Sequence, residues 1–359
     1  MKDLKYNRLL IIDGSHALHR SISEPHLWTM TNSKGERTGG IYGTLQTILK
    51  ESSTYNYFPV VIFDGQLSKR RLSLYDNYKH WSDKQMLLES VEYPTELELL
   101  QAEQKVEYKR QREILKQLLP ALGIPVIHLA DWEGDDLIYI LSTLTLDSVI
   151  LSDDKDLLQL LYDDGTRRCR VRRGMRDEFL DKAYLAENGM TELDFIACKA
   201  IIGDQSDNIP SACYQVGEKT ALPLYRIYTY CKEQEISFPT DEKSLTDICK
   251  KLNISKRKAY LNFDENIFLR NLLLVNLFIV ENDIDDNVLN EIDNSMRATI
   301  NEFDLDTLTN ILNELEINRF DTQSLVQNVN TTKGNVYISS YDPSKSIPDL
   351  IPHKMGKLF

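Results

Sequence analysis

Four short apolar runs in this chain each lead into acidic residues. The runs are separated by stretches with helical character, which is typical of buried strands in a parallel sheet. Because ligands bind beyond the carboxyl ends of such strands, we expect the acids to gather at one edge of an α/β sheet. The runs and their acids are residues 9–12 with Asp13, 60–63 with Asp64, 125–129 with Glu133, Asp135 and Asp136, and 148–151 with Asp154 and Asp156; a fifth acidic pair, Asp204 and Asp207, follows the next expected helix.

The acids expected at this edge carry more negative charge than a folded domain tolerates without compensation. Two like charges about 4 Å apart repel by about 4 kcal/mol at an effective dielectric of 20. Several such pairs would offset the roughly 5–15 kcal/mol that stabilises a typical domain, so bound cations or protons must neutralise them. No histidine or cysteine stands among these acids, and an oxygen-only set favours Mg²⁺, with Mn²⁺ as a substitute, over zinc.

Each acid also has a structural explanation when it is taken alone. Asp135 and Asp136 can stabilise the start of a helix, and Asp207 before Asn208 suits an Asx turn. The combination of so many acids at one sheet edge is what favours a metal site. Two hard cations near basic surfaces suggest phosphodiester hydrolysis, in which the ions activate water and stabilise the leaving oxygen.

The net charge of the chain does not exclude a nucleic-acid partner. The 359 residues carry a formal net charge of −13, but residues 281–317 alone hold eleven acids and one base, Arg297. Residues 167–176 hold six arginines and no acid, and smaller basic clusters occur at 69–71 and 105–112. An acidic protein can therefore still present a basic stripe to phosphates.

Composition also sets an expected compartment. No apolar run approaches the about 18 residues of a membrane span, and the first residues lack a signal-peptide core, so we expect no membrane association. The five cysteines are scattered and show no metal-type spacing, which is typical of a reducing cytoplasm.

The length suggests two domains. Residues 1–160 alternate strand and helix signals, so we expect an α/β domain at 1–202 with a polar, helix-prone insertion at about 68–122. Thr191 and Asp194 indicate a capping-box start for a helix that ends before Gly203. Residues 203–320 read as mainly helical, and residues 321–359, rich in Asn, Thr, Ser and Pro, are expected to form a loosely ordered tail.

At this point the ordered motifs support a family resemblance. The chain resembles the five-prime nuclease (flap endonuclease) superfamily, in particular the nuclease domain of bacterial DNA polymerase I and its stand-alone phage relatives. The resemblance implies a PIN-like or resolvase-like, mainly parallel sheet with helices on both faces, a helical arch at about 68–122 and a helical C-terminal subdomain that binds duplex DNA. The matching motifs are Leu-Ile-Ile-Asp-Gly-Ser (10–15), Thr-Asn-Ser-Lys-Gly-Glu-Arg-Thr-Gly-Gly-Ile-Tyr-Gly (31–43), Val-Ile-Phe-Asp-Gly (61–65), Glu-Gly-Asp-Asp (133–136), Ser-Asp-Asp-Lys-Asp (152–156), Gly-Asp-Gln-Ser-Asp-Asn-Ile-Pro (203–210) and Val-Gly-Glu-Lys-Thr-Ala (216–221).

The resemblance also assigns site residues. All nine family acids are present and would be ligands of two Mg²⁺ ions. Arg71, Tyr78 and Lys79 would lie at the base of the arch, where Lys79 contacts the scissile phosphate and Tyr78 stacks on an unpaired base. The nine acids are Asp13, Asp64, Glu133, Asp135, Asp136, Asp154, Asp156, Asp204 and Asp207.

A helix–two-turn–helix element that grips duplex DNA is implied for the segment from Ile209 onward, with K⁺ as a bound ion. Gly217 would let the backbone approach a phosphate, and Lys219 and Thr220 would follow at the helix start. Three departures from the family pattern stand out. Ser82 replaces an arch arginine, with Lys84 nearby as a substitute; residues 211–215 replace a glycine-rich turn with one extra residue; and the arch segment is longer.

We therefore expect a monomeric, Mg²⁺-dependent 5′-3′ exonuclease or flap endonuclease that removes RNA primers or 5′ flaps during replication. Its DNA would carry 5′ flaps, nicks or RNA primers, and its compartment would be the cytoplasm of a bacterium or a phage-infected host. The end of the chain, residues 355–359, faintly resembles a sliding-clamp-binding peptide, and a single-strand-binding protein is a second expected partner. Two alternatives stay open: a non-catalytic branched-DNA-binding protein of the same fold, and a PIN-like ribonuclease.

Overall fold

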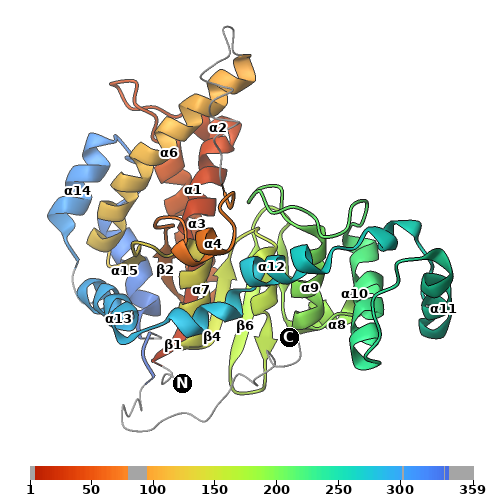
Figure 1. Cartoon of the computed structure of the whole chain (residues 1–359). Coiled ribbons are helices and arrows are strands. Elements are labelled where there is room, and N and C mark those ends of the chain that lie inside the picture. The colour runs from red at the N-terminus through yellow and green to blue at the C-terminus, as the bar shows by residue number, and fades with distance from the viewer. Residues whose placement is uncertain (1–4, 80–94, 301–302, 335, 339–359) are drawn as a thin grey trace.

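A seven-stranded sheet lies at the centre of the computed structural model, which describes residues 5–79, 95–300, 303–334 and 336–338 (Figure 1). The strand order is β3-β2-β1-β4-β6-β5, with β7 paired to β6. The first five strands of this order pair in parallel, whereas β5 and β7 run antiparallel to β6. The strands are β1 (Tyr6–Asp13), β2 (Phe58–Ile62), β3 (Val126–Ile127), β4 (Thr145–Leu151), β5 (Tyr162–Asp163), β6 (Arg168–Arg173) and β7 (Glu178–Leu180).

The four apolar runs of the sequence are the four strands β1 to β4, as predicted. Strand β1 is central and pairs with β2 and β4 on its two sides. The register places Ile12 opposite Leu151 of β4 and Asp13 opposite Ile62 of β2. The carboxyl ends of these strands are therefore level with one another, and the residues that follow them begin at the same edge.

Helices lie on both faces of the sheet. Helices α1 (Gly14–Ser23), α3 (Gly39–Tyr55) and α6 (Glu96–Ala121) pack on one another, and α7 (Gly134–Thr143) packs on β1 and β4. Helix α6 begins with a capping box formed by Thr95 and Glu98, which confirms the helical nature of that part of the insertion. The insertion also contains α4 (Lys69–Leu74), and Ser82 and Lys84 lie outside the described residues.

A second apolar core belongs to a helical unit of residues 196–275. It unites α9 (Glu192–Ile202), α10 (Glu218–Glu233), α11 (Glu242–Leu252) and α12 (Glu265–Val275). The Thr191–Asp194 capping box at the start of α9 is present as predicted. The remaining short helices are α2 (Pro25–Trp28), α8 (Lys182–Glu187), and 3₁₀ turns at Asp156–Leu160, Lys258–Asn262 and Leu277–Asp283.

The chain after residue 275 returns to the first core, which corrects the expected boundary of a helical subdomain at 203–320. Apolar side chains of α13 (Asp286–Ile300) and α14 (Leu305–Glu314) are buried in the same cluster as β1 and β2. In Figure 1, α13 and α14 accordingly lie at the opposite end of the molecule from α10 and α11. The sequence pattern showed that these segments are helical but could not show which core they join.

The expected tail at 321–359 is wrong for its first part. Helix α15 (Thr322–Lys333) packs on α3 and β2, and its Leu325 and Val329 are buried in the first core. Asp321 caps this helix by accepting the Ser324 backbone N–H. The helix was not predicted because most of its residues are polar and only a narrow face is apolar. Just beyond it, Tyr337 forms a bridge with Tyr6 of β1. Residues 339–359 lie outside the described part of the chain.

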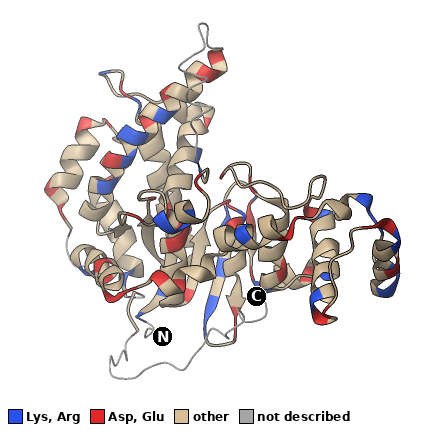
Figure 2. Cartoon of the chain, viewed as in Figure 1, with Lys and Arg blue, Asp and Glu red and all other residues tan. Residues whose placement is uncertain are grey.

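The arginine-rich run at 167–176 is a strand and its flanks rather than a basic stripe for phosphates. Most of it is β6, and Arg172 and Arg173 are buried. Arg168 and Arg170 contact Asp147 at 2.5 and 2.9 Å, and Arg172 contacts Glu51 at 3.3 Å. These guanidinium groups are therefore largely occupied by carboxylates, which corrects the expectation drawn from their number. Figure 2 likewise shows acidic and basic residues interspersed over the ribbon.

Candidate functional site

The carboxylates of Asp13 and Asp64 begin the site, because both lie where central strands end. Asp13 accepts the backbone N–H of His16 at 2.9 Å, which caps α1, and accepts the hydroxyl of Ser152 at 3.0 Å. Asp64 accepts the backbone N–H of Gly134 at 2.8 Å, at the start of α7. Each carboxylate thus ties the end of its strand to a neighbouring element, which fixes its position.

Asp13 and Asp64 belong to a group, named here the inner carboxylates, which also includes Asp135, Asp154 and Asp156. All are half-buried except Asp154, which is exposed. Burial and the nearby charge of Asp64 raise the pKa of Asp13 to about 6. Burial and the charge of Asp154 raise the pKa of Asp156 to about 6. Burial, Asp154 and Asp13 raise the pKa of Asp135 well above its usual value. Acids that follow four strands, β1 to β4, therefore lie close enough at one edge to affect one another's pKa values.

Asp156 also contacts a lysine that the sequence analysis missed. Lys199 Nζ lies 2.6 Å from Asp156 Oδ1 and 2.6 Å from Asp204 Oδ2, and so bridges the inner carboxylates to the fifth acidic pair. Burial works to raise the pKa of Asp204, but hydrogen bonds from Lys199 and Ser206 outweigh it and lower that pKa. The available signal was the position of Lys199 in the last turn of the helix that precedes this pair.

A second lysine bridges Glu133 and Asp207. Lys79 Nζ lies 2.7 Å from Glu133 Oε2 and 3.8 Å from Asp207 Oδ1. Burial opposes the charge of Glu133, but the positive charges of Arg71 and Lys79 outweigh it and lower the pKa of Glu133 to about 2. The backbone of Lys79 adopts a left-handed φ of 50° and donates to Asp207 O at 2.9 Å, so both ends of this residue are held at the site.

Tyr78 is placed differently from the expectation that its ring stacks on an unpaired base. Its side chain is only 2% exposed, and its hydroxyl donates to Glu133 at 2.9 Å and contacts Asp207 at 3.3 Å. The ring belongs to the core of the helical unit. In this structure Tyr78 therefore supports the two acids instead of facing a nucleotide, which corrects the stacking expectation.

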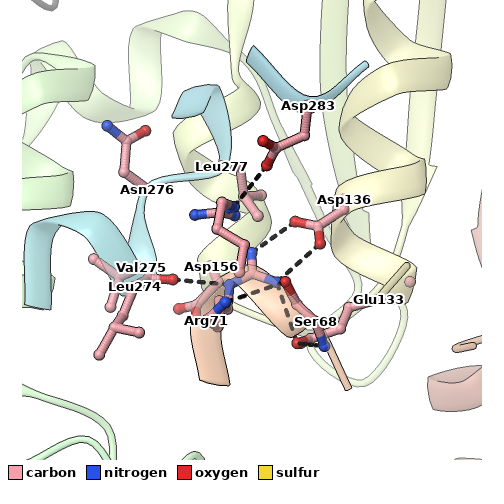
Figure 3. Close-up of polar contacts among 12 residues, drawn as sticks. Ser68, Arg71, Glu133, Asp136, Asp156, Leu274, Val275, Asn276, Leu277 and Asp283 are labelled. Carbon is pink, nitrogen blue, oxygen red and sulfur yellow. Dashed lines mark hydrogen bonds and ion pairs between the residues drawn. The ribbon is translucent and has the colours of Figure 1, made fainter. Parts of the chain in front are cut away.

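Arg71 and Asp136 form a buried pair next to this group (Figure 3). Arg71 also lies 3.3 Å from Glu133, and its Nε donates to the Leu274 carbonyl at 3.0 Å. Leu274 ends the helical unit, so the arginine joins both cores as well as two acids. Because Arg71 holds both oxygens of Asp136, this acid does not face the inner carboxylates with a free oxygen.

The donor set fits a hard divalent cation in its chemistry. The inner carboxylates offer oxygen ligands, and burial together with the charges of neighbouring carboxylates raises the pKa of three of them, Asp13, Asp135 and Asp156. Among the residues that the structure describes, no three acidic, histidine or cysteine side chains already converge as a metal shell. Lys79 instead neutralises Glu133, and Lys199 neutralises Asp204 and part of the charge of Asp156, as ammonium groups can do beside carboxylates.

The turn before α10 holds the residues expected to bind duplex DNA. Gly217 is the N-cap of α10, and a side chain there would meet nothing within 4 Å. Thr220 Oγ1 accepts the Gly217 N–H at 3.0 Å, and Lys219 is exposed beside them. This helix start is open to solvent, as an approach to phosphate requires.

The preceding turn, residues 211–216, is closed by its own side chains. The Ser211 hydroxyl contacts the carbonyls of Ile201 at 3.0 Å and Cys213 at 2.8 Å. The Ala212 carbonyl accepts from the Asp264 N–H at 2.8 Å. The Ile201 and Cys213 carbonyls also accept the backbone N–H groups of Ala212 and Val216, so the turn is closed without the bound K⁺ that the resemblance implied.

Within its described residues, the protein has no helix that is both long and apolar enough to cross a bilayer.

Comparison with known proteins agrees with this geometry. A family model described as the 5′-3′ exonuclease, N-terminal resolvase-like domain matches residues 8–189. A 5′-3′ exonuclease of Aquifex aeolicus is 31% identical over 229 residues, which cover 61% of this chain and 69% of that protein. DNA polymerase I of Streptococcus pneumoniae is 32% identical over 228 residues, covering 60% of this chain and 23% of the polymerase. The match thus spans about a quarter of that polymerase.

Solved structures share the fold across nearly the whole chain. The bacteriophage T5 flap endonuclease, in a complex with DNA and metal ions, superposes with a TM-score of 0.52 at 19% identity and covers 90% of this chain and 99% of its own. Flap endonuclease-1 of Methanococcus jannaschii superposes with a TM-score of 0.51 at 16% identity and covers 91% of this chain and 92% of its own.

Proposed function

The chain belongs to the 5′-3′ exonuclease family, and on that premise we propose that it is a Mg²⁺-dependent, structure-selective 5′ nuclease. It hydrolyses phosphodiester bonds at the 5′ ends of flaps, nicks and RNA-primed duplexes, and so removes primers or flaps during replication. Such work places it in the cytoplasm of a bacterium or of a phage-infected host. It acts as a monomer, and Mn²⁺ can replace Mg²⁺.

The observation that carries this proposal is the gathering at one sheet edge of the inner carboxylates, whose charges raise one another's pKa values. Asp13, Asp64, Asp135, Asp154 and Asp156 lie at one sheet edge, and Asp154 is exposed to solvent. Together with Glu133, Asp204 and Asp207 they would hold two divalent ions. When bound, these ions neutralise the carboxylates, orient a phosphodiester and make water more acidic.

The other side chains of the site contribute positive charge and position. Lys79 is 24% exposed, which lets its ammonium group contact a phosphate oxygen at the same edge. Arg71 is buried and acts through the acids it holds, because its guanidinium group fixes Asp136 and neutralises part of the charge of Glu133. We assign Asp136 as a positioning residue for Arg71, and any ligand role requires it to release that arginine.

Duplex DNA is held at the start of α10. The exposed Gly217 backbone, Lys219 and Thr220 would contact phosphates without reading base edges, and the arch lysine Lys84 would add a further contact. Binding should therefore weaken steeply with salt. The K⁺ ion is not part of the proposal, because Ser211 already closes the turn. A clamp contact would use residues 355–359, which lie outside the described residues.

A cleavage assay on labelled flap, nicked and RNA-primed duplexes tests the proposal. Cleavage should require Mg²⁺ and should be lost in Asp154→Asn, which removes one charge but keeps a side chain that can accept the Asp156 N–H. Asp163→Asn is the matched control, because Asp163 is an exposed acid on β5, away from the strand-end edge.

The alternatives predict different results in the same assay. A non-catalytic branched-DNA-binding protein would bind all three duplexes and cut none. A ribonuclease would cut only the RNA-primed duplex. Undiminished turnover in Asp154→Asn would contradict the role given to the inner carboxylates.

A further inference from the structure

The loop between α9 and α10 displays an aromatic side chain that neither the strand-end acids nor the start of α10 explains. Tyr214 is 73% exposed, the highest value among the large apolar side chains in the described part of the chain. Exposing a tyrosine ring forfeits the stabilisation that its burial would bring. The apolar residues around it in the chain show no such exposure, since Cys213 is fully buried and Val216 is 7% exposed.

The backbone that carries Tyr214 is fixed on both sides. The Ala212 N–H donates to the Ile201 carbonyl at 2.8 Å, and the Cys213 thiol contacts the Ala259 carbonyl at 3.1 Å. After the tyrosine, Gln215 adopts a left-handed φ of 64° and the Val216 N–H donates to Cys213 O at 3.2 Å. The backbone that carries the ring is therefore ordered before any partner binds, which lowers the conformational entropy lost on binding.

The surroundings of Tyr214 indicate a polyanionic partner. Gly217 follows three residues later, and its backbone is accessible to a ligand because no atom lies within 4 Å of where a side chain would begin. Lys219, two residues further, is exposed. Glu218, at the same helix start, is paired with Lys155 and lies near the positive charge of Arg176. An exposed ring a few residues before the exposed Lys219 suits the sugar–phosphate backbone of a duplex, which offers apolar sugar faces between its charges.

We propose that Tyr214 is a duplex-contacting residue that packs its ring against the sugars of the DNA held at the start of α10. This inference rests on the proposed function. The ring adds a contact made by dispersion and apolar burial, whereas the other contacts proposed at the start of α10 are electrostatic contacts to phosphates. Such a contact contributes affinity that salt does not remove, and it does not distinguish one base sequence from another.

The test measures binding of a labelled nicked duplex by fluorescence anisotropy over a series of salt concentrations, in the Asp154→Asn background. Tyr214→Ala should weaken binding about ten-fold, within the range that alanine substitution of a stacking aromatic produces. The slope of log Kd against log salt should stay unchanged, and Tyr214→Phe should bind like the parent. Lys219→Ala, by contrast, should lower that slope by about one.

Leu305→Ala serves as the matched control, since Leu305 is 48% exposed on α14 at the other end of the molecule. Equal affinity of Tyr214→Ala and this control would overturn the inference while leaving the proposed function intact. Loss of self-association in Tyr214→Ala, measured by sedimentation with unchanged DNA affinity, would also overturn it and would assign the ring to a second copy of the chain. If the unmodified protein, with Asp154 intact, fails to bind and cut the nicked duplex, the proposed function falls as well.

Discussion

Arg71 and Asp136 meet through two parallel contacts, with Nη1 2.9 Å from Oδ2 and Nη2 2.6 Å from Oδ1. Both side chains are 3% exposed, so removing one charge leaves the other with little water to solvate it. Asp136→Asn should lower the free energy of unfolding by about 3 kcal/mol, since Glu133 still lies beside the arginine. Urea unfolding measures this change, and a loss no larger than that of Asp163→Asn would contradict it.

Asp135→Asn should have the opposite effect in metal-free protein. Asp135 faces the charges of Asp154 and Asp13, which raise its pKa together with burial. Removing its charge relieves that repulsion, so the urea midpoint in EDTA should rise. With Mg²⁺ the parent should gain more stability than the variant, because the variant offers the ion one charged oxygen fewer. A lower midpoint in EDTA would refute this account.

Acid should stabilise the metal-free protein through Asp13 and Asp156. Their pKa values rise from 3.8 to about 6 on folding, so between these values the folded chain binds more protons than the unfolded chain. The contribution of these groups to the unfolding free energy therefore falls as pH rises through this window. Glu133, with a pKa lowered to about 2, acts with the opposite sign and only at lower pH. Unfolding in EDTA at about pH 5 and about pH 7 should show the difference, and Asp156→Asn should reduce it.

Lys199 should compete with divalent cations for Asp156 and Asp204. Replacing it in Lys199→Met leaves both carboxylates without their ammonium partner, so the metal-free protein should melt at a lower temperature. The rise in melting temperature on adding Mg²⁺ should then exceed that of the parent. Lys155→Met is the control, because Lys155 lies next to Asp156 in sequence but pairs with the exposed Glu218. An equal rise in all three proteins would rule out the competition.

Duplex binding should not depend on the identity of the monovalent cation. The Ser211 hydroxyl already contacts the Ile201 and Cys213 carbonyls, so exchanging K⁺ for Na⁺ at constant ionic strength should leave Kd unchanged. Ser211→Gly removes this hydroxyl and should weaken binding. A marked preference of the unmodified protein for K⁺ would show that an ion enters the turn in spite of the serine.

Local patterns were sufficient to predict the strands and the acidic edge. The runs before Asp13 and Asp64 are short, apolar and followed by acids, and parallel pairing then brings their ends together whatever the loops do. The helix after Thr191 was likewise predictable, because a capping box depends on residues three positions apart. Each of these inferences needed only neighbouring residues or a general rule of sheet geometry.

Pairings between distant residues could not be predicted in the same way. Arg170 and its partner Asp147 are brought together by adjacent strands, so the sequence displays the positive charge without the carboxylate that compensates it. Lys199 and Asp156 meet only because α9 packs beside the 3₁₀ turn at Asp156–Leu160. Which of the two cores α15 joins could not be predicted for the same reason. The apolar stripe of Leu325 and Val329 shows that one face is buried but not which element covers it.

The bridge between Tyr6 and Tyr337 has a consequence for how the chain is made. The first core contains side chains from both β1 and Val336, while the helical unit of residues 196–275 is inserted between them. During synthesis residues up to Val336 must therefore emerge from the ribosome before this core can close. The helical unit, whose contacts are nearer in sequence, can fold earlier, while the first core is still incomplete. Vectorial synthesis thus favours an order in which the helical unit forms before the first core is complete.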